Sequence, residues 1–169
     1  RMENSSSLID AHCHLRTTID GSSVLPNPDI CSCETNLTSI STITAEKAFQ
    51  LLIAEMAEAN VCHSVVLHLA WQPWSVEEFA YALKHHDNLT GFVNINPKSP
   101  TAIPDLKRAY DLGFRGLKLH PRIQKYYPDE KCCIDLVRSA GDLGFPVIID
   151  CFPDGDWLLA GMNLLQYAN

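Results

Sequence analysis

The sequence lacks any long apolar run. No stretch approaches the roughly 18 apolar residues that a membrane-spanning helix needs, and the N-terminus has no apolar core of a signal peptide. Positive charge is also scarce: 13 Lys and Arg residues stand against 20 Asp and Glu residues, so the formal net charge is -7 at pH 7. A chain with this balance is repelled by nucleic acids and by anionic membranes. We therefore expect neither as a partner, whereas a small-molecule substrate stays open.

The paired cysteines of a zinc knuckle are also missing, although the sequence contains seven cysteines. Cys31 and Cys33 are separated by one residue and Cys132 and Cys133 are adjacent, whereas a knuckle needs a two-residue gap. The remaining sequence is typical of an intracellular α/β protein, in which thiols stay reduced. We interpret these cysteines as structural thiols and expect a cytoplasmic location.

Five apolar segments rich in β-branched residues alternate with five segments of helical periodicity. The expected strands are residues 8–12, 63–69, 89–95, 116–120 and 146–151. The expected helices are residues 44–60, 75–86, 100–112, 129–143 and 154–168. From the second strand onward the strand centres recur every 24 to 31 residues, close to the length of one strand-helix unit. This alternation predicts a parallel sheet with right-handed crossovers, in a single domain over residues 1–169.

Local signals mark several of the expected helix ends. Thr44 is the expected N-cap of the first helix, and Ser75 with Glu78 forms the pattern of a capping box. Gly113 and Gly144 stand where helix C-caps belong. The first connection, residues 15–43, is rich in Ser, Thr, Asn, Pro and Asp and has no sustained period. A loop of this length inside a compact domain is usually functional.

Two α/β folds fit five strand-helix units: an open, doubly wound sheet and a (β/α) barrel of the TIM type. The doubly wound class carries a glycine-rich phosphate loop after its first strand, and here that turn reads AHCHLRTT. The choice in favour of the barrel therefore depends on the residues at the strand ends.

His12 and His14 close the first expected strand, in LIDAHCHL. Side chains alternate along a strand, so the two imidazoles project to one face, about 6.6 Å apart along the chain. Two imidazoles at this spacing can bind one divalent ion, and we expect zinc. Asp10 shares their parity and is expected to orient a ligand. The alternative is a pair of solvated polar residues at a strand end, and a metal site is the better interpretation.

Lys118 and His120 share one face of the fourth expected strand, in GFRGLKLHP. An unpaired buried lysine costs free energy, and the carboxyl ends of barrel strands are where active sites lie. Three roles stay open for Lys118: an anchor for a substrate anion, a bridging ligand of two metals if it is carbamylated, or an ion-pair partner of a carboxylate such as Asp150. His120 is expected to contact substrate or metal.

Other polar residues also stand near strand ends. Asp150 ends the fifth strand, in PVIIDCF, and is a candidate metal ligand or orienting carboxylate, with a structural role equally open. His68 ends the second strand and either lines the pocket or is a hydrogen-bonded core histidine, the more common outcome. Asn94 and Asn96, in VNINP, are expected to fix the loop after the third strand.

These motifs resemble, in this order, the amidohydrolase-2 branch of the amidohydrolase superfamily. LIDAHCHL, GFVNINP, DLGFRGLKLHP and LGFPVIID carry the resemblance from residue 8 nearly to the end. The members are metal-dependent (β/α)₈ barrels that include hydrolases and non-oxidative decarboxylases. The resemblance implies that His12 and His14 are metal ligands and that Lys118, His120 and Asp150 are catalytic. It also implies a metal-activated water that attacks a C–N or C–O bond of a small molecule.

The sequence departs from the family pattern at two points. Asp150 stands where the family usually has a histidine ligand, and only five strand-helix units fit, whereas a closed barrel of this type needs eight. We therefore expect an incomplete (β/α) barrel. Three alternatives to a hydrolase stay open: a decarboxylase of the same superfamily, an inactive barrel fragment that forms a homo-oligomer through open sheet edges, and a TatD-type phosphodiesterase. The last group also opens with His-x-His but usually carries a glutamate on the fourth strand.

Overall fold

The computed structural model describes residues 7–18 and 42–151. Within them, five strands form one sheet in the order β1-β2-β3-β4-β5, and every neighbouring pair is parallel. The strands are β1 (Leu8–Cys13), β2 (Val61–Leu67), β3 (Leu89–Asn94), β4 (Gly116–Leu119) and β5 (Val147–Ile149). All five begin and end within two residues of the predicted bounds, so the strand prediction is confirmed.

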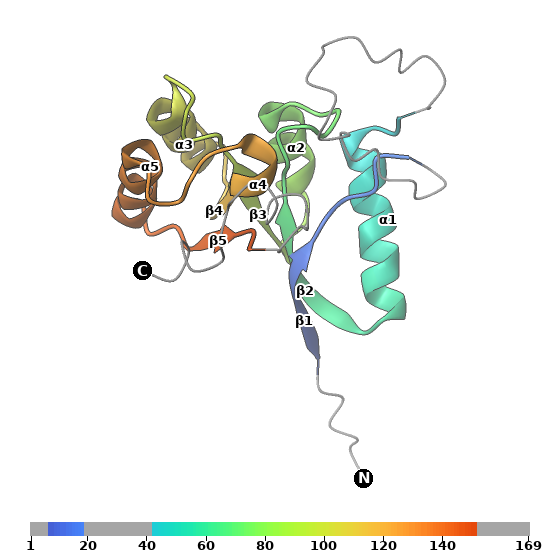
Figure 1. Ribbon diagram of the computed structural model, residues 1–169. Helices are drawn as coiled ribbons and strands as arrows, with labels where there is room; N and C mark the ends of the chain where they lie inside the picture. Colours follow the sequence, from blue (N-terminus) through green and yellow to red (C-terminus); the bar gives the residue numbers. More distant parts are fainter. Residues whose placement is uncertain (1–6, 19–41, 152–169) are drawn as a thin grey trace.

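Four helices of two turns or more alternate with the strands in the described part of the chain. They are α1 (Ala45–Glu58), α2 (Val76–Leu83), α3 (Ala102–Asp111) and α5 (Lys131–Asp142). The sheet curls, and these helices lie along its outer side, with α1 packed against α2 and α3 against α5 (Figure 1). The arrangement is an incomplete (β/α) barrel, as predicted. The predicted helix over residues 154–168 lies outside the described residues.

The helix ends follow the predicted capping signals. Thr44 Oγ1 accepts the backbone N–H of Lys47 at 3.2 Å. At the start of α2, Ser75 Oγ accepts the N–H of Glu78 at 3.1 Å, and Glu78 Oε2 accepts the N–H of Ser75 at 2.8 Å. Gly113 and Gly144 have positive φ angles of 102° and 71°, as helix-terminating glycines do. Local chemistry therefore accounts for these boundaries.

A fifth helix, α4 (Pro121–Gln124), is inserted between β4 and α5 and was not predicted. It is a single turn, too short to show a helical period in the sequence. Pro121 at its first position and Lys125 in the left-handed conformation after it define its two ends. Its place directly after β4 puts it beside the carboxyl end of the sheet.

The central strands of the sheet carry buried side chains on both faces. On the helical side, the fully buried Phe79 ring lies 5.0 Å from Phe49 and 5.7 Å from Phe114, measured between centroids. On the other face, Phe92 lies over Gly116, where an added Cβ would come within 2.4 Å of the Phe92 ring. Gly116 is therefore required by close packing inside the half-barrel.

The strand β1 forms one edge of the sheet and pairs irregularly with β2. Its register shifts between Leu8 and Ile9 and again between Asp10 and Cys13. Leu8 and Ile9 are 55% and 67% exposed. After β1, an antiparallel bridge joins Thr18 to Thr42. This bridge closes the described base of the predicted loop 15–43, of which residues 19–41 lie outside the described residues.

No helix in residues 7–18 and 42–151 combines the length and apolar character needed to cross a membrane.

Candidate active site

The predicted site residues gather at the carboxyl end of the sheet. His12 lies near the end of β1, Lys118 lies on β4, and His14, His120 and Asp150 directly follow β1, β4 and β5. The charges of Lys118 and Asp150 act on the titration of both His12 and His14, and His14 acts on that of His120. Since β1 and β4 are not neighbours in the sheet, only its curvature brings these groups together.

The two histidines of the first strand converge. Their Nε2 atoms are 3.1 Å apart, and their rings meet edge to face with centroids 5.0 Å apart. Burial lowers the pKa of both side chains. The positive charge of Lys118 lowers the pKa of His12 further. At His14 the charge of His12 has the next largest lowering effect, followed by that of Lys118. Both imidazoles are thus kept neutral, the form that binds metal.

This pair fits a shared divalent ion. Two nitrogens that each lie about 2.0–2.1 Å from a tetrahedral zinc ion are about 3.4 Å from each other, close to the observed 3.1 Å. A hydrogen bond between one protonated and one unprotonated ring also fits this distance. In the part of the chain that the structure describes, no group of three or more His, Cys, Asp or Glu side chains is arranged to hold a metal. The metal site therefore stays a prediction.

Lys118 is almost completely buried, at 1% exposure. It lies in register with Asn94 of β3 and Ile148 of β5, on the inner face of the sheet. Burial lowers the pKa of Lys118, and the negative charge of Asp150 opposes this effect. Among residues 7–18 and 42–151, Lys118 forms no ion pair. Of its three open roles, the ion pair with Asp150 is not observed.

Asp150 contacts two other side chains. Its Oδ2 accepts a hydrogen bond from Arg122 Nε at 3.3 Å and lies 3.4 Å from His120 Nδ1. The His120 contact is close but lacks hydrogen-bond geometry, because Nδ1 of that ring has no hydrogen-bond partner in the described structure. Burial lowers the pKa of His120 to about 4, against the opposing charge of Asp150. His120 is therefore neutral at pH 7.

Two site residues were not found from the sequence. Arg122 belongs to the unpredicted helix α4, and Trp71 lies in the loop after β2, with its ring 5.1 Å from the His120 ring in an edge-to-face contact. Only their position in the sequence could have indicated them. Both residues follow the carboxyl end of a strand in a parallel sheet, and ligands bind at that end.

Asn94 fixes the loops that carry these residues. It is 4% exposed, and its Nδ2 donates to the carbonyl of Lys118 at 3.0 Å. Its Oδ1 accepts the Ala70 N–H at 3.3 Å and Gln124 Nε2 at 3.1 Å. Asn94 was expected to fix the loop after β3, but it holds the loop after β2 and helix α4. Asn96 does fix the loop after β3, since its Oδ1 accepts the N–H of Lys98 at 3.0 Å.

Two further candidates have structural contacts. Asp10 Oδ1 accepts the backbone N–H of His12 at 3.0 Å, and the irregular pairing between Asp10 and Cys13 breaks the alternation on which their expected shared face depended. His68 is 3% exposed, with Nε2 3.3 Å from the Trp74 carbonyl and its ring edge-on to Phe79. His68 is therefore a core histidine, as predicted, but only Nε2 has a hydrogen-bond partner, and Nδ1 has none among the described residues.

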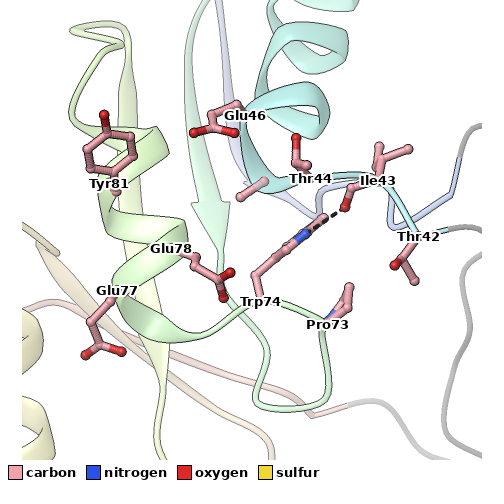
Figure 2. A pocket seen from close by; sticks show the side chains of 10 residues that line it. Thr42, Ile43, Thr44, Glu46, Pro73, Trp74, Glu77, Glu78 and Tyr81 are labelled. Atoms are coloured by element: carbon pink, nitrogen blue, oxygen red, sulfur yellow. Dashed lines mark hydrogen bonds between the residues drawn. The ribbon is translucent and has the colours of Figure 1, made fainter.

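A separate cavity of about 620 Å³ lies between the N-termini of α1 and α2 (Figure 2). In it Trp74 Nε1 donates to the Ile43 carbonyl at 2.9 Å. Two of its three carboxylates are already engaged: Glu77 pairs with Arg108 at 2.8 Å, and Glu78 caps α2. None of the predicted catalytic or metal-binding residues lines this cavity.

The fold is that of an incomplete (β/α) barrel, with a group of polar side chains at the carboxyl end of its strands. A solved structure, a probable 2-pyrone-4,6-dicarboxylic acid hydrolase from Acinetobacter baumannii with citric acid bound, is similar to this chain with a TM-score of 0.55 and 16% sequence identity. The match covers 85% of this chain and 49% of that one, so the chain spans about half the length of the protein it matches. No family model and no curated protein matches the sequence. The likeness shows the barrel fold.

Proposed function

We propose that this chain carries the first half of a metal-dependent hydrolase site of the amidohydrolase type, which cleaves a C–N or C–O bond of a small molecule. The observation that carries the proposal is the convergence of His12 and His14, with Nε2 atoms 3.1 Å apart, beside Lys118, His120 and Asp150. The position of this group at the carboxyl end of the strands supports the proposal, because barrel enzymes have their active sites at that end. The similar structure, a probable 2-pyrone-4,6-dicarboxylic acid hydrolase, is consistent with a hydrolase.

In this proposal His12 and His14 hold the ion. A divalent ion at this position supplies Lewis acidity toward a carbonyl group and toward water. Hydrolysis then adds water across the acyl bond, so that the acyl carbon gains OH and the leaving nitrogen or oxygen gains the proton. Asp150, a carboxylate at the end of β5, accepts a hydrogen bond from Arg122 Nε.

His120 contributes a neutral imidazole. Its Nδ1 faces Asp150 at 3.4 Å, which leaves Nε2 to contact substrate or water. The lowered pKa, about 4, makes the ring a poor proton store at neutral pH, because general bases work best with a pKa near the working pH. We therefore assign His120 to positioning and hydrogen bonding of the reacting group.

Metal binding tests the proposal directly. The purified chain is stripped of metal, titrated with zinc or manganese, and analysed by calorimetry and elemental analysis. We expect stoichiometric binding in the wild type and a loss of at least tenfold in affinity in His12→Ala and His14→Ala. His85→Ala, which removes an exposed histidine at the end of α2, is the matched control and is expected to bind as the wild type does. Absence of stoichiometric metal, or equal binding in all variants, would remove the proposal.

Turnover of a pyrone dicarboxylate separates the two enzyme classes. A hydrolase opens the ring with uptake of one water, whereas a decarboxylase releases carbon dioxide, and mass spectrometry of the product distinguishes these outcomes. We expect ring opening that depends on added metal and is lost in His12→Ala.

A further inference from the structure

We propose that Lys118 binds an anionic group of the substrate, a carboxylate, and thereby makes the site selective for acids over their neutral analogues. The inference rests on the proposed function for the identity of the reaction. The anion site itself follows from the burial and charge of the residues around Lys118.

The first step is the burial of a cation without a counter-ion. Lys118 is 1% exposed and forms no ion pair within residues 7–18 and 42–151. A buried ammonium group of this kind is costly to the fold, and proteins keep such groups where they serve a site. Lys118 lies in register with Asn94 and Ile148 and shares the strand parity of Gly116, which packs against Phe92 inside the half-barrel, so it lies on the inner face of the sheet.

The second step is that the carboxylates of the site are engaged elsewhere. Asp150 accepts a hydrogen bond from Arg122 Nε at 3.3 Å and lies 3.4 Å from His120 Nδ1. Asp10 Oδ1 accepts the backbone N–H of His12 at 3.0 Å. In the described part of the chain neither carboxylate forms an ion pair with Lys118. The ammonium group of Lys118 can therefore pair with a negatively charged group of a ligand.

A carboxylate is the group that fits these features. It accepts a charge-assisted hydrogen bond from an ammonium group and brings only one negative charge into the buried place. A phosphate brings nearly two, and burying a further charge costs free energy. Lys118 stands two residues before His120, about 6.6 Å deeper along the strand. The carboxylate therefore lies at the floor of the site, with the reacting group above it near the histidines.

Trp71 offers the rest of the substrate a flat aromatic neighbour at the mouth of the site. Its ring contacts His120 edge to face at 5.1 Å, and its side chain is partly exposed. Benzoate and benzamide are suitable probes, because the two have nearly the same shape and differ in charge. Citrate is a second, non-aromatic anion. All titrations use metal-free protein, so that the readout does not depend on the metal.

The experiment compares the wild type with Lys118→Met and with Lys107→Met, an exposed lysine on α3. We expect benzoate or citrate to bind the wild type and raise its melting temperature, and benzamide to bind at least tenfold more weakly. Lys118→Met is expected to lose about 10- to 100-fold in anion affinity, as removal of a charge-assisted hydrogen bond does. Lys107→Met is expected to behave as the wild type. Lys118→Met is also expected to melt at a higher temperature without ligand, since it removes the buried charge.

Three results overturn the inference. One is failure of both benzoate and citrate to bind the wild type at millimolar concentration. Another is equal anion affinity in the wild type and Lys118→Met, or in Lys118→Gln if the first variant does not fold. The third is a carbamate carbon signal, absent in Lys118→Met, when the wild type is incubated with carbon-13 bicarbonate. If the protein binds anions but neither binds metal nor turns over substrate, the proposed function is refuted and this inference stands. If it binds metal and turns over substrate but does not select anions, only this inference is refuted.

Discussion

Asp150 is the residue at which the sequence departs from the pattern that it otherwise resembles. In that pattern a histidine usually stands here, whereas the structure shows a carboxylate that contacts Arg122 and His120 at 3.3 and 3.4 Å. A carboxylate offsets the guanidinium charge, which a neutral imidazole would not. Because Arg122 engages Asp150, Lys118 has no ion pair with it.

Cysteine reactivity gives a prediction for single residues. Burial raises the pKa of Cys133 to about 11 and that of Cys13 to about 12, so both are almost entirely thiols at pH 8. The thiolate is the reactive form. We expect iodoacetamide at pH 8 to label the exposed Cys62 and to leave Cys13 and Cys133 unmodified, as mapped by peptide mass spectrometry. In urea all of them are expected to react, and equal labelling of the folded protein would contradict the prediction.

The sequence predicted part of the candidate site and missed the rest for a physical reason. His12, His14, Lys118, His120 and Asp150 lie on or directly after strands, and the carboxyl ends of parallel strands meet at one edge of the sheet. Arg122 and Trp71 lie on connections, whose paths are set by tertiary contacts such as the hydrogen bonds of Asn94 to Gln124 and Ala70. No local pattern encodes those contacts.

At the scale of elements, the N-terminus of α2 gives a prediction on pH. Hydrogen bonds from the backbone N–H and then the hydroxyl of Ser75 lower the pKa of Glu78 below its usual value. A lowered folded-state pKa means that the carboxylate stabilises the fold at neutral pH, and that this effect is lost as the pH falls through the folded-state pKa. We expect Glu78→Gln to be less stable than the wild type at pH 7 and equally stable at about pH 2, below the carboxyl range.

Urea denaturation at both pH values measures this difference. Glu58→Gln is the control, because Glu58 lies in the last turn of α1. There the helix dipole disfavours a carboxylate, so its removal is expected to stabilise the helix slightly at pH 7. A Glu78→Gln deficit that persists unchanged at low pH would show that the side chain acts through packing instead of charge.

Elements were predicted well where a local signal marks them. Thr44, Ser75 and Gly113 define helix ends through hydrogen bonds or φ angles that involve a few neighbouring residues. Helix α4 was missed because four residues carry no period. The irregular pairing of β1 was also missed, since a register shift between Asp10 and Cys13 depends on the partner strand and not on β1 alone.

At the scale of the whole molecule, the sheet has two edges where a closed barrel has none. Closing a barrel links strand number, tilt and shear, and five strands do not meet that condition. The described strand order ends at β1 on one side and β5 on the other. His12 and His14 lie at the carboxyl end of β1, so they are at one edge of the described sheet. A further strand that pairs with β1 would therefore lie beside both histidines.

The exposed edge at β1 predicts self-association of this chain. Leu8 and Ile9 are 55% and 67% exposed on a strand that pairs on one side only among the described residues, and such edges recruit further strands. We expect the wild type to associate with itself as its concentration rises from low to high micromolar, as followed by sedimentation velocity. Ile9→Lys is expected to weaken this association, because a charge on an edge strand opposes pairing.

Ile103→Lys, which changes a residue that is 47% exposed on α3, is the matched control. A wild type that stays monomeric, or an equal effect of both substitutions, would show that the β1 edge is not the contact surface.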